Sequence, residues 1–330
     1  MDLSTTYLGL ALPHPVLAGA SPLSDTLEGI GRLEEAGAAA VVLSSLFEEQ
    51  IEGRPVHRKP YARLDPAEVK PADYFSIHEE LPFGPVEYLE HIRRAKAATG
   101  IPIIASLNGT APGNWAGFAR QIQEAGADAL EANVYYTVTD LFQTGQNVEQ
   151  RIIEIVQQLK QTTSLPVALK LTPFFSSLPN LARQLDDHGI EGLVLFNRFY
   201  LPDIDLMRLE SVPRLRLSDS SELPLSLMWL AVLSGRLGAS LAACGGVHQS
   251  EDVIKTVMAG ADAVQMVSAL LRHGVEHLTV VRDGIAQWLL RRQFQSLREI
   301  HGCLSLLRSA ADPQAFQRGL YAATLQKWEP

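Results

Sequence analysis

The stretch that decides the fold is Leu241–Leu271, which reads LAACGGVHQSEDVIKTVMAGADAVQMVSALL. It opens with an apolar run over 241–244 that is too short for a helix. A helix is expected over 251–259, because Ser250 is a good N-cap and Gly260 can end a helix as a C-cap glycine. The pattern therefore predicts a strand, a turn and a helix, followed by a second strand.

Small residues follow both of these strands. Gly245 and Gly246 end the first, and the apolar run over 263–267 leads into Ser268 and Ala269. Glycines let a ligand approach the backbone, and free N–H groups at helix starts favour negative charge. A pair of glycines alone indicates only a tight turn. Two adjacent strand ends of this kind predict a phosphate-binding site, which (β/α)8 barrels place after their last two strands.

The same arrangement recurs along the chain. A helix end, a glycine, small residues and an apolar run follow one another at Gly37, Gly126, Gly189, Gly238 and Gly260. Continuous apolar runs are typical of parallel strands buried on both faces. Such runs occur at about 15–20, 38–45, 102–106, 127–134, 166–171, 190–197, 239–244 and 261–267. Eight βα units favour an α/β fold of the closed (β/α)8 TIM-barrel type over a doubly wound sheet.

Helices are expected between these strands, and two connections are unusually long. The expected helices cover about 25–36, 86–99, 114–125, 147–163, 178–188, 224–237, 250–259 and 276–292, with a terminal one over 295–309. Residues 46–85 after strand 2 and 198–223 after strand 6 are too long for plain βα loops. Both leave the strand ends where barrel active sites lie, so we expect a lid or rim there. Residues 1–330 are expected to form a single domain.

Composition narrows the classes of function. The formal net charge is −9 without long basic runs, which argues against nucleic acid and acidic membrane surfaces as partners. Two cysteines make neither a disulfide framework nor a metal spacing, and nine histidines form no HExxH motif or tight cluster. We therefore expect solvated histidines and no metal. The N-terminus lacks a leader pattern and no membrane span is evident, so a cytoplasmic protein is expected.

Polar residues at the expected strand ends are the candidates for chemistry. Gly19 and Ala20 end strand 1, Ser44 ends strand 2, and amides follow three further strands as Asn108, Asn133 and Asn197. Lys170 stands inside the apolar run of strand 5. A buried lysine needs an anionic neighbour or an altered pKa, and Glu131 is the nearest choice if the pair is only structural. The asparagines could also merely cap turns.

Taken together, these residues suit a flat heterocycle with a phosphate tail. Amides can meet a pyrimidine edge, small residues leave room for a ring, and Lys170 can stabilise negative charge at the N1–C2=O locus of a reduced flavin. The candidate set for flavin mononucleotide (FMN) comprises Gly19, Ala20, Ser44, Asn108, Asn133, Lys170, Asn197, Gly245, Gly246, Ser268 and Ala269.

The ordered motifs resemble the dihydroorotate dehydrogenase family, especially its soluble class 1 enzymes. Residues 15–21, PVLAGAS, are similar to the opening NP-x-x-x-ASG strand, and 52–55, EGRP, to the E-G-N-P segment. Residues 130–133, LEAN, resemble E-L-N-L-S, and 168–173, ALKLTP, resemble GVKLPP. The stretch from Cys244 to Leu270 is similar to the GTGGI…AGA-x-x-VQ-x-GTAL signature. The resemblance covers most of the chain and implies an FMN-binding barrel, a role in pyrimidine biosynthesis and a homodimer.

The chain departs from the family pattern at the substrate side. Tyr136 stands where class 1 enzymes have the catalytic Cys, and Leu43 replaces the strand 2 Lys. The segment that holds orotate is not recognisable in residues 74–80. A tyrosine of ordinary pKa ~10 is a poor base near neutrality. These departures predict a substrate other than dihydroorotate.

The first hypothesis is therefore an FMN-dependent oxidoreductase acting on a CH–CH group beside a carbonyl. Lys170 would stabilise the reduced flavin, and Tyr136 or Thr137 would serve as proton donor on the loop after strand 4. The substrate would be pyrimidine-like or another carbonyl-conjugated small molecule, and the electron acceptor stays open. Two alternatives remain: a non-catalytic barrel that binds a flavin or phosphometabolite, and a non-redox aldolase or isomerase that uses Lys170.

Overall fold

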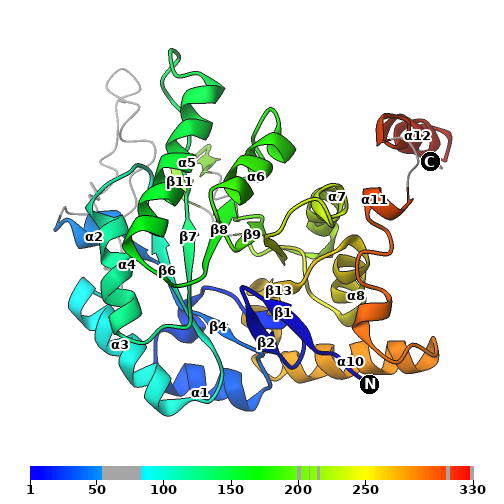
Figure 1. The fold of residues 1–330 in the computed structure, drawn as a ribbon, viewed down its shortest axis with the longest axis horizontal. Helices are drawn as coiled ribbons and strands as arrows, with labels where there is room; N and C mark the ends of the chain where they lie inside the picture. Colours follow the sequence, from blue (N-terminus) through cyan, green and yellow to red (C-terminus); the bar gives the residue numbers. More distant parts are fainter. Residues whose placement is uncertain (54–82, 199–201, 208, 214–215, 310–312, 328–330) are drawn as a thin grey trace.

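The computed structural model describes residues 1–53, 83–198, 202–207, 209–213, 216–309 and 313–327. Its centre is a closed parallel barrel, so the predicted TIM-barrel fold is confirmed (Figure 1). The eight barrel strands are β3 (Val16–Ala18), β4 (Val41–Val42), β6 (Ile103–Asn108), β7 (Ala129–Asn133), β8 (Val167–Leu171), β9 (Gly192–Leu195), β12 (Ser240–Cys244) and β13 (Ala263–Met266). Pairing of β4 with both β3 and β6 closes the ring, and β5 (Leu46–Phe47) extends the second strand along β6.

The expected helices surround the barrel. They are α1 (Leu27–Glu35), α3 (Pro85–Ala98), α4 (Asn114–Glu124), α5 (Gly145–Thr162), α6 (Leu178–Asp187), α7 (Leu223–Leu233), α8 (Ser250–Ala259) and α10 (His277–Arg291). Gly260 takes a left-handed φ of 111° and ends α8, as predicted. The start of α8 differs from the prediction, because Gln249 is the N-cap and the Asp252 carboxylate accepts from the Gln249 N–H at 3.1 Å.

The prediction of a helix over 295–309 is wrong. This segment holds only a 3₁₀ turn, Leu297–Glu299, and a short helix, α11 (Leu306–Ser309). Gly302 between them adopts a left-handed φ of 63°, which interrupts helical geometry. The structure also contains elements that we did not predict: 3₁₀ turns at Pro22–Ser24 and Ser220–Glu222, and the helices α2 (Glu48–Ile51), α9 (Ser268–His273) and α12 (Pro313–Gln326).

An unpredicted hairpin, β1 (Thr5–Tyr7) with β2 (Leu10–Leu12), closes the amino-terminal end of the barrel. Tyr7 and Leu8 of this hairpin pack with Leu17 and small strand residues in a buried apolar cluster. Gly192 makes room for it, because a Cβ there would lie 2.4 Å from a methyl group of Leu8. The hairpin therefore acts as an apolar plug.

The barrel interior changes from apolar to polar along the strands. Inward positions near the plug are Ala129, Ala168 and Ala263, and the next inward positions are Glu131, Lys170 and Gln265. Side chains two residues apart share a face of a strand, so this step is a direct consequence of strand periodicity. The polar side chains that could take part in a reaction therefore lie toward the carboxyl-terminal end of the barrel strands.

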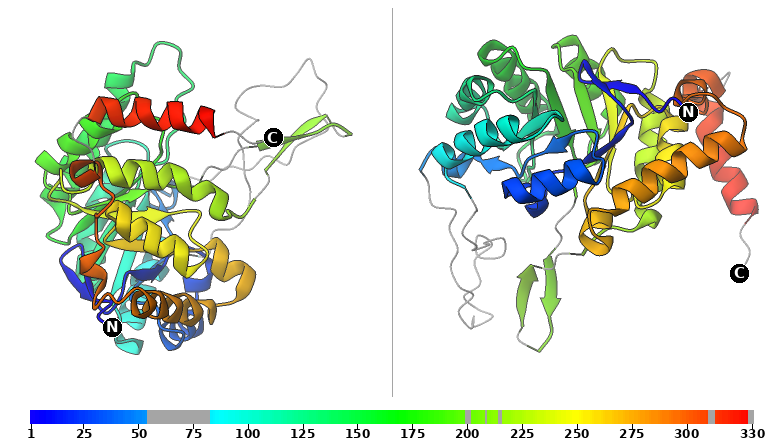
Figure 2. Two further views of the ribbon diagram at one scale, coloured as in Figure 1. Left: turned by 90° about the vertical axis from the view of Figure 1, so that its right-hand side faces the viewer. Right: turned by 90° about the horizontal axis from the view of Figure 1, so that it is seen from below.

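The two long connections start from strand ends at this polar end. Most of the first, residues 54–82, falls outside the described residues, and so do Arg54, Pro55 and the segment 74–80. The second contains a hairpin, β10 (Pro202–Asp205) with β11 (Glu210–Pro213), which extends away from the barrel on the side opposite the plug (Figure 2). In the part of the chain that the structure describes, no helix is both long and apolar enough to cross a bilayer.

Two buried tyrosines provide a test of this packing. The fully buried Tyr7 hydroxyl finds no hydrogen-bond partner among the described residues. The Tyr88 hydroxyl accepts from the Ser106 N–H at 2.8 Å and donates to the Ser106 carbonyl at 3.1 Å. Tyr7→Phe is expected to raise the free energy of unfolding by about 1 kcal/mol, whereas Tyr88→Phe lowers it by about 1–3 kcal/mol. Urea denaturation measures the free energy of unfolding of both variants. A Tyr7→Phe protein less stable than the parent would contradict the conclusion that the Tyr7 hydroxyl has no hydrogen-bond partner among the described residues.

Candidate functional site

A buried ionic network lies in the upper layer of the barrel. The Lys170 ammonium donates to Glu131 Oε1 at 3.1 Å and to Gln265 Oε1 at 2.8 Å, and the Gln265 amide donates to the other Glu131 oxygen. Lys170 is 5% exposed, while Glu131 and Gln265 are 1% exposed. The expected Lys170–Glu131 pair is confirmed. Gln265, which the sequence reasoning missed, contacts both members.

This network keeps Lys170 charged. Burial on its own would lower the lysine pKa, but the charge of Glu131 and hydrogen bonds to Glu131 and Cys244 outweigh it and raise the pKa above its ordinary value. Burial raises the pKa of the Cys244 thiol, which therefore stays protonated near neutrality. Glu131 is then the anion that holds the proton on Lys170. The site therefore contains an almost fully buried lysine that is charged near neutrality.

Amide side chains gather above this cation at the barrel mouth. Asn197 Nδ2 donates to Asn133 Oδ1 at 2.8 Å, and Asn108 is the register partner of Asn133 on the next strand. All three are half-buried. Gly109 allows Trp115 to pack beside them, because a Cβ there would lie 2.3 Å from the indole ring. The structure thus brings the predicted amides together over Lys170.

The ends of strands 1 and 2 form another side of the mouth. Gly19 must be small, because an added Cβ would lie 2.7 Å from a Val267 methyl group. Ala20 beside it is half-buried. The Ser44 hydroxyl donates to the Ser21 carbonyl at 2.9 Å and contacts the Asp25 carboxylate, whose pKa is raised by burial. Ser44 is therefore tied to the loop after strand 1.

The predicted phosphate nest is built from two strand ends and a third loop. Gly245 and Gly246 have φ of 85° and 74°; a Cβ on Gly246 would lie 2.5 Å from the Leu223 nitrogen, whereas one on Gly245 would point into open space. The buried Ser218 joins the two ends, since its N–H donates to Ser268 Oγ at 3.1 Å and its Oγ accepts from the Gly246 N–H at 3.4 Å.

Sequence reasoning missed Ser218, although a serine-rich run before α7 was a visible signal. Ala269, predicted as a cofactor contact, is fully buried in the apolar core behind Ser268. It supports the nest through packing.

The loop after strand 4 holds Tyr136 in a defined position. Its hydroxyl donates to Gln143 Oε1 at 2.7 Å, and the Arg151 guanidinium lies 4.7 Å from the centre of its ring. Tyr136 is half-buried, whereas Thr137 beside it is exposed. The structure supplies partners for the tyrosine that the loop sequence did not indicate.

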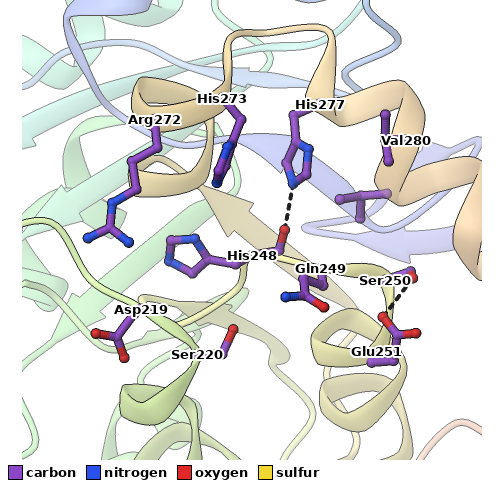
Figure 3. A pocket seen from close by; sticks show the side chains of 11 residues that line it. Asp219, Ser220, His248, Gln249, Ser250, Glu251, Arg272, His273, His277 and Val280 are labelled. Carbon is purple, nitrogen blue, oxygen red and sulfur yellow. Dashed lines mark hydrogen bonds between the residues drawn. The ribbon is translucent and has the colours of Figure 1, made fainter.

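The expectation of solvated, scattered histidines is wrong for several of them. His14, His91 and His248 are buried, and His248 lies with His273 and His277 around one cavity (Figure 3). Burial lowers the His248 pKa, and the nearby Arg272 lowers it further. No group of three or more His, Cys, Asp or Glu side chains placed to hold a metal occurs among the described residues.

The buried cation, the clustered amides and the glycine-bearing strand ends all lie at the carboxyl-terminal face of the barrel, which is where (β/α)8 barrels carry their active sites. The family model for dihydroorotate dehydrogenase matches residues 84–289, and the chain belongs to this family. The resemblance inferred from the sequence motifs is confirmed.

Several relatives match across most of the chain. The catalytic subunit of the NAD⁺-dependent dihydroorotate dehydrogenase B of Pyrococcus abyssi is 25% identical over 316 residues, 91% of this chain and 98% of that protein. The NAD-dependent dihydropyrimidine dehydrogenase subunit PreA of Escherichia coli K12 is 23% identical over 319 residues, 91% of this chain and 76% of that subunit. An Aeropyrum pernix family member is 30% identical over 207 residues, 61% of this chain and 67% of that protein.

The buried ion pair predicts a specific stability pattern. Glu131→Gln leaves the Lys170 ammonium without its anion and is expected to lower the free energy of unfolding by about 3–5 kcal/mol. The double variant Glu131→Gln with Lys170→Met removes both charges and should recover most of that loss. Chemical denaturation of the three proteins measures the coupling. Equal stability of the single and double variants would show that the pair carries no such coupling.

Proposed function

We propose that this chain is an FMN-dependent oxidoreductase that acts on a CH–CH group beside a carbonyl. The observation that carries the proposal is the permanent Lys170 cation under a ring of amides, close to a phosphate nest. Membership of the dihydroorotate dehydrogenase family supports it. The named activities of the relatives are oxidations of dihydropyrimidine rings, which belong to the same reaction class.

The residues present fit FMN. Open space above Gly245 lets a ligand approach the backbone, and the Ser268 hydroxyl, which accepts from the Ser218 N–H, keeps its own O–H to donate to a phosphate. Asn108, Asn133 and Asn197 would meet the pyrimidine edge of the ring system, with Gly19, Ala20 and Ser44 on another side. Bound FMN would supply the hydride exchange itself, while the protein supplies binding, orientation and charge.

Lys170 has an electrostatic role in this proposal. Glu131 and Gln265 accept from its ammonium and Cys244 also hydrogen-bonds to it, so the cation is held in a fixed position beneath the barrel mouth. A charge held without solvent stabilises negative charge more strongly than one in water. The raised pKa also argues against a Schiff base, because an amine attacks a carbonyl only when it is deprotonated. The aldolase alternative is thereby weakened.

The substrate side differs from that of a dihydroorotate enzyme in our proposal. Leu43, which replaces the family lysine, is fully buried in the apolar core and brings no charge to the mouth. Tyr136 replaces the catalytic cysteine, and Gln143 and Arg151 orient it. We assign it the role of proton donor in preference to Thr137, whose exposed position lets it be hydrated. Because both family residues are replaced, we expect a carbonyl-conjugated substrate other than dihydroorotate.

A homodimer or a partner subunit that accepts electrons completes the proposal. Met207 is 93% exposed at the tip of the β10–β11 hairpin, next to Leu206 and Leu209, and Phe142 is 92% exposed on the loop after β7. Exposed apolar side chains at one end of a barrel are typical of association surfaces. Light scattering of the purified protein measures the oligomeric state, and a monomer at all concentrations would leave the homodimer unsupported.

An absorption spectrum tests the cofactor directly. The purified chain is expected to be yellow, to be bleached by dithionite under anaerobic conditions and to keep its colour with dihydroorotate. Bleaching by dihydroorotate would show that the protein oxidises dihydroorotate although Tyr136 replaces the catalytic cysteine on the loop after strand 4. A flavin that dithionite reduces but no electron acceptor reoxidises would favour the non-catalytic binding alternative. A colourless protein that also refuses added FMN would end the flavin proposal.

The proton donor is tested by two adjacent variants. With a substrate found by screening dihydropyrimidines and enones, Tyr136→Phe is expected to lower kcat by about 10²–10⁴-fold, because a positioned acid contributes about that much. Thr137→Val should leave kcat within twofold or so of the parent. Stopped-flow bleaching by the substrate gives both rates, and dithionite reduction serves as the control for intact flavin binding. Equal rates in the parent and Tyr136→Phe would exclude the tyrosine.

A further inference from the structure

A cavity of about 500 Å³ lies outside the barrel wall at the corner between α9 and α10 (Figure 3). Arg272, His273 and His277 enter it from this corner. Asp219 and Ser220 border it from the 3₁₀ turn before α7, and His248 to Glu251 border it where the chain enters α8. A cavity of this size falls in the range of about 300–1,000 Å³ that holds small-molecule ligands. It lies on the other side of Ser218 from the barrel mouth.

One side of the cavity offers a cation and imidazole rings. Arg272 donates to the Leu217 carbonyl at 3.1 Å through one nitrogen, which leaves further N–H groups of its guanidinium for a ligand. The His273 and His277 rings lie 4.9 Å apart, and His277 Nε2 pairs with the His248 carbonyl at 2.7 Å. Figure 3 shows these side chains directed from the helix corner toward His248 and Asp219.

The opposite side offers a carboxylate. Hydrogen bonds from the Ser221 hydroxyl and N–H lower the pKa of Asp219, so it is ionised near neutrality. Glu251 also borders the cavity and accepts from the Ser250 hydroxyl at 3.0 Å. A simple anion would be repelled by these carboxylates. An apolar ligand would offer no group of opposite charge to Arg272 or Asp219. A ligand that carries both a phosphate and free hydroxyl groups matches both sides.

We propose that this cavity is a second nucleotide site that binds a nucleoside 5′-monophosphate. Its phosphate pairs with Arg272, its ribose hydroxyls donate to Asp219, and its base lies against the His273 and His277 rings. Arginine is suited to bidentate phosphate recognition, and an acidic side chain is the usual partner of ribose hydroxyls. A metal is disfavoured as the occupant, because no metal-binding group occurs among the described residues.

The cavity and the phosphate nest share a wall. Ser218 contacts the Gly246 N–H on one side and His248 Nε2, at 3.3 Å, on the other, and the Leu217 carbonyl before it receives the Arg272 bond. The nucleotide can therefore come from two sources: a free metabolite, or the adenylate half of a flavin dinucleotide whose first phosphate lies in the nest. The chemistry recognised at Arg272 and Asp219 is the same for both.

Calorimetric titration of the full chain, saturated with FMN, with adenosine monophosphate tests the site. Binding is expected for the parent, and Arg272→Gln should weaken it by about tenfold or more, because a charge-assisted phosphate contact is lost. Arg291→Gln is the matched control: this exposed arginine lies at the far end of α10 and does not border the cavity. Undiminished binding by Arg272→Gln, or no binding to the parent at millimolar nucleotide, would overturn the proposal.

A second variant separates nucleotide recognition from simple anion binding. Asp219→Asn should weaken binding of adenosine monophosphate but leave binding of inorganic phosphate as tight or tighter, because a carboxylate that repels a simple anion is removed; weakening of both ligands alike would contradict the ribose contact. Comparing FMN with flavin adenine dinucleotide then identifies the source. Tighter dinucleotide binding that Arg272→Gln removes points to the flavin, and equal binding points to a free nucleotide. A protein that binds no flavin would contradict the proposed function. The same titration with adenosine monophosphate, carried out without flavin, would still show whether the cavity binds a nucleotide.

Discussion

The buried pair of Lys170 and Glu131 is the interaction on which the upper half of the barrel depends. An ammonium ion inside a barrel is tolerated only if an anion and further acceptors surround it. Glu131 meets that need from β7, the strand beside the lysine strand, and Gln265 meets it from β13, which is not a neighbour of the lysine strand. The register of three strands and the closure of the barrel must therefore be correct before the charge is stabilised.

The apolar side chains that stabilise the barrel and the polar side chains that could take part in a reaction lie in separate layers of the barrel interior. The hairpin plug and the small strand residues above it form an apolar layer that packs the strands together and contains one buried polar side-chain group, the Tyr7 hydroxyl, which is unpaired among the described residues. Two residues further along β7, β8 and β13, the inward side chains are the charged or amide-bearing Glu131, Lys170 and Gln265. The alternation of strand side chains makes this division sharp, and the carboxyl-terminal loops then add Tyr136, Ser218 and the glycines to a scaffold that is already rigid.

Much of the fold could be predicted because its signals are local. Glycines after helices, apolar runs and residue 170 inside a strand are visible within windows of a few residues, and the strands and most helices lie close to where these signals place them. Among the features that were not predicted correctly, one has a local cause and another depends on contacts between residues far apart in the sequence. The helix expected over 295–309 is interrupted at Gly302, a conformation that the apolar pattern did not reveal. The three clustered histidines lie up to 29 residues apart, and only the meeting of two helix starts brings them together.

The sequence by itself determined the order of strands and helices, the parallel barrel, and the need of Lys170 for a carboxylate such as Glu131. Each of these follows from periodicity, capping or the cost of burying a charge, which depend on residue type and spacing. Only the tertiary structure decided that Gln265 hydrogen-bonds to both members of the pair, that Ser218 joins the ends of β12 and β13, and that Arg272 faces Asp219 across a cavity. The Gln265–Glu131 contact joins residues 134 positions apart, and such a contact exists only once the barrel has closed.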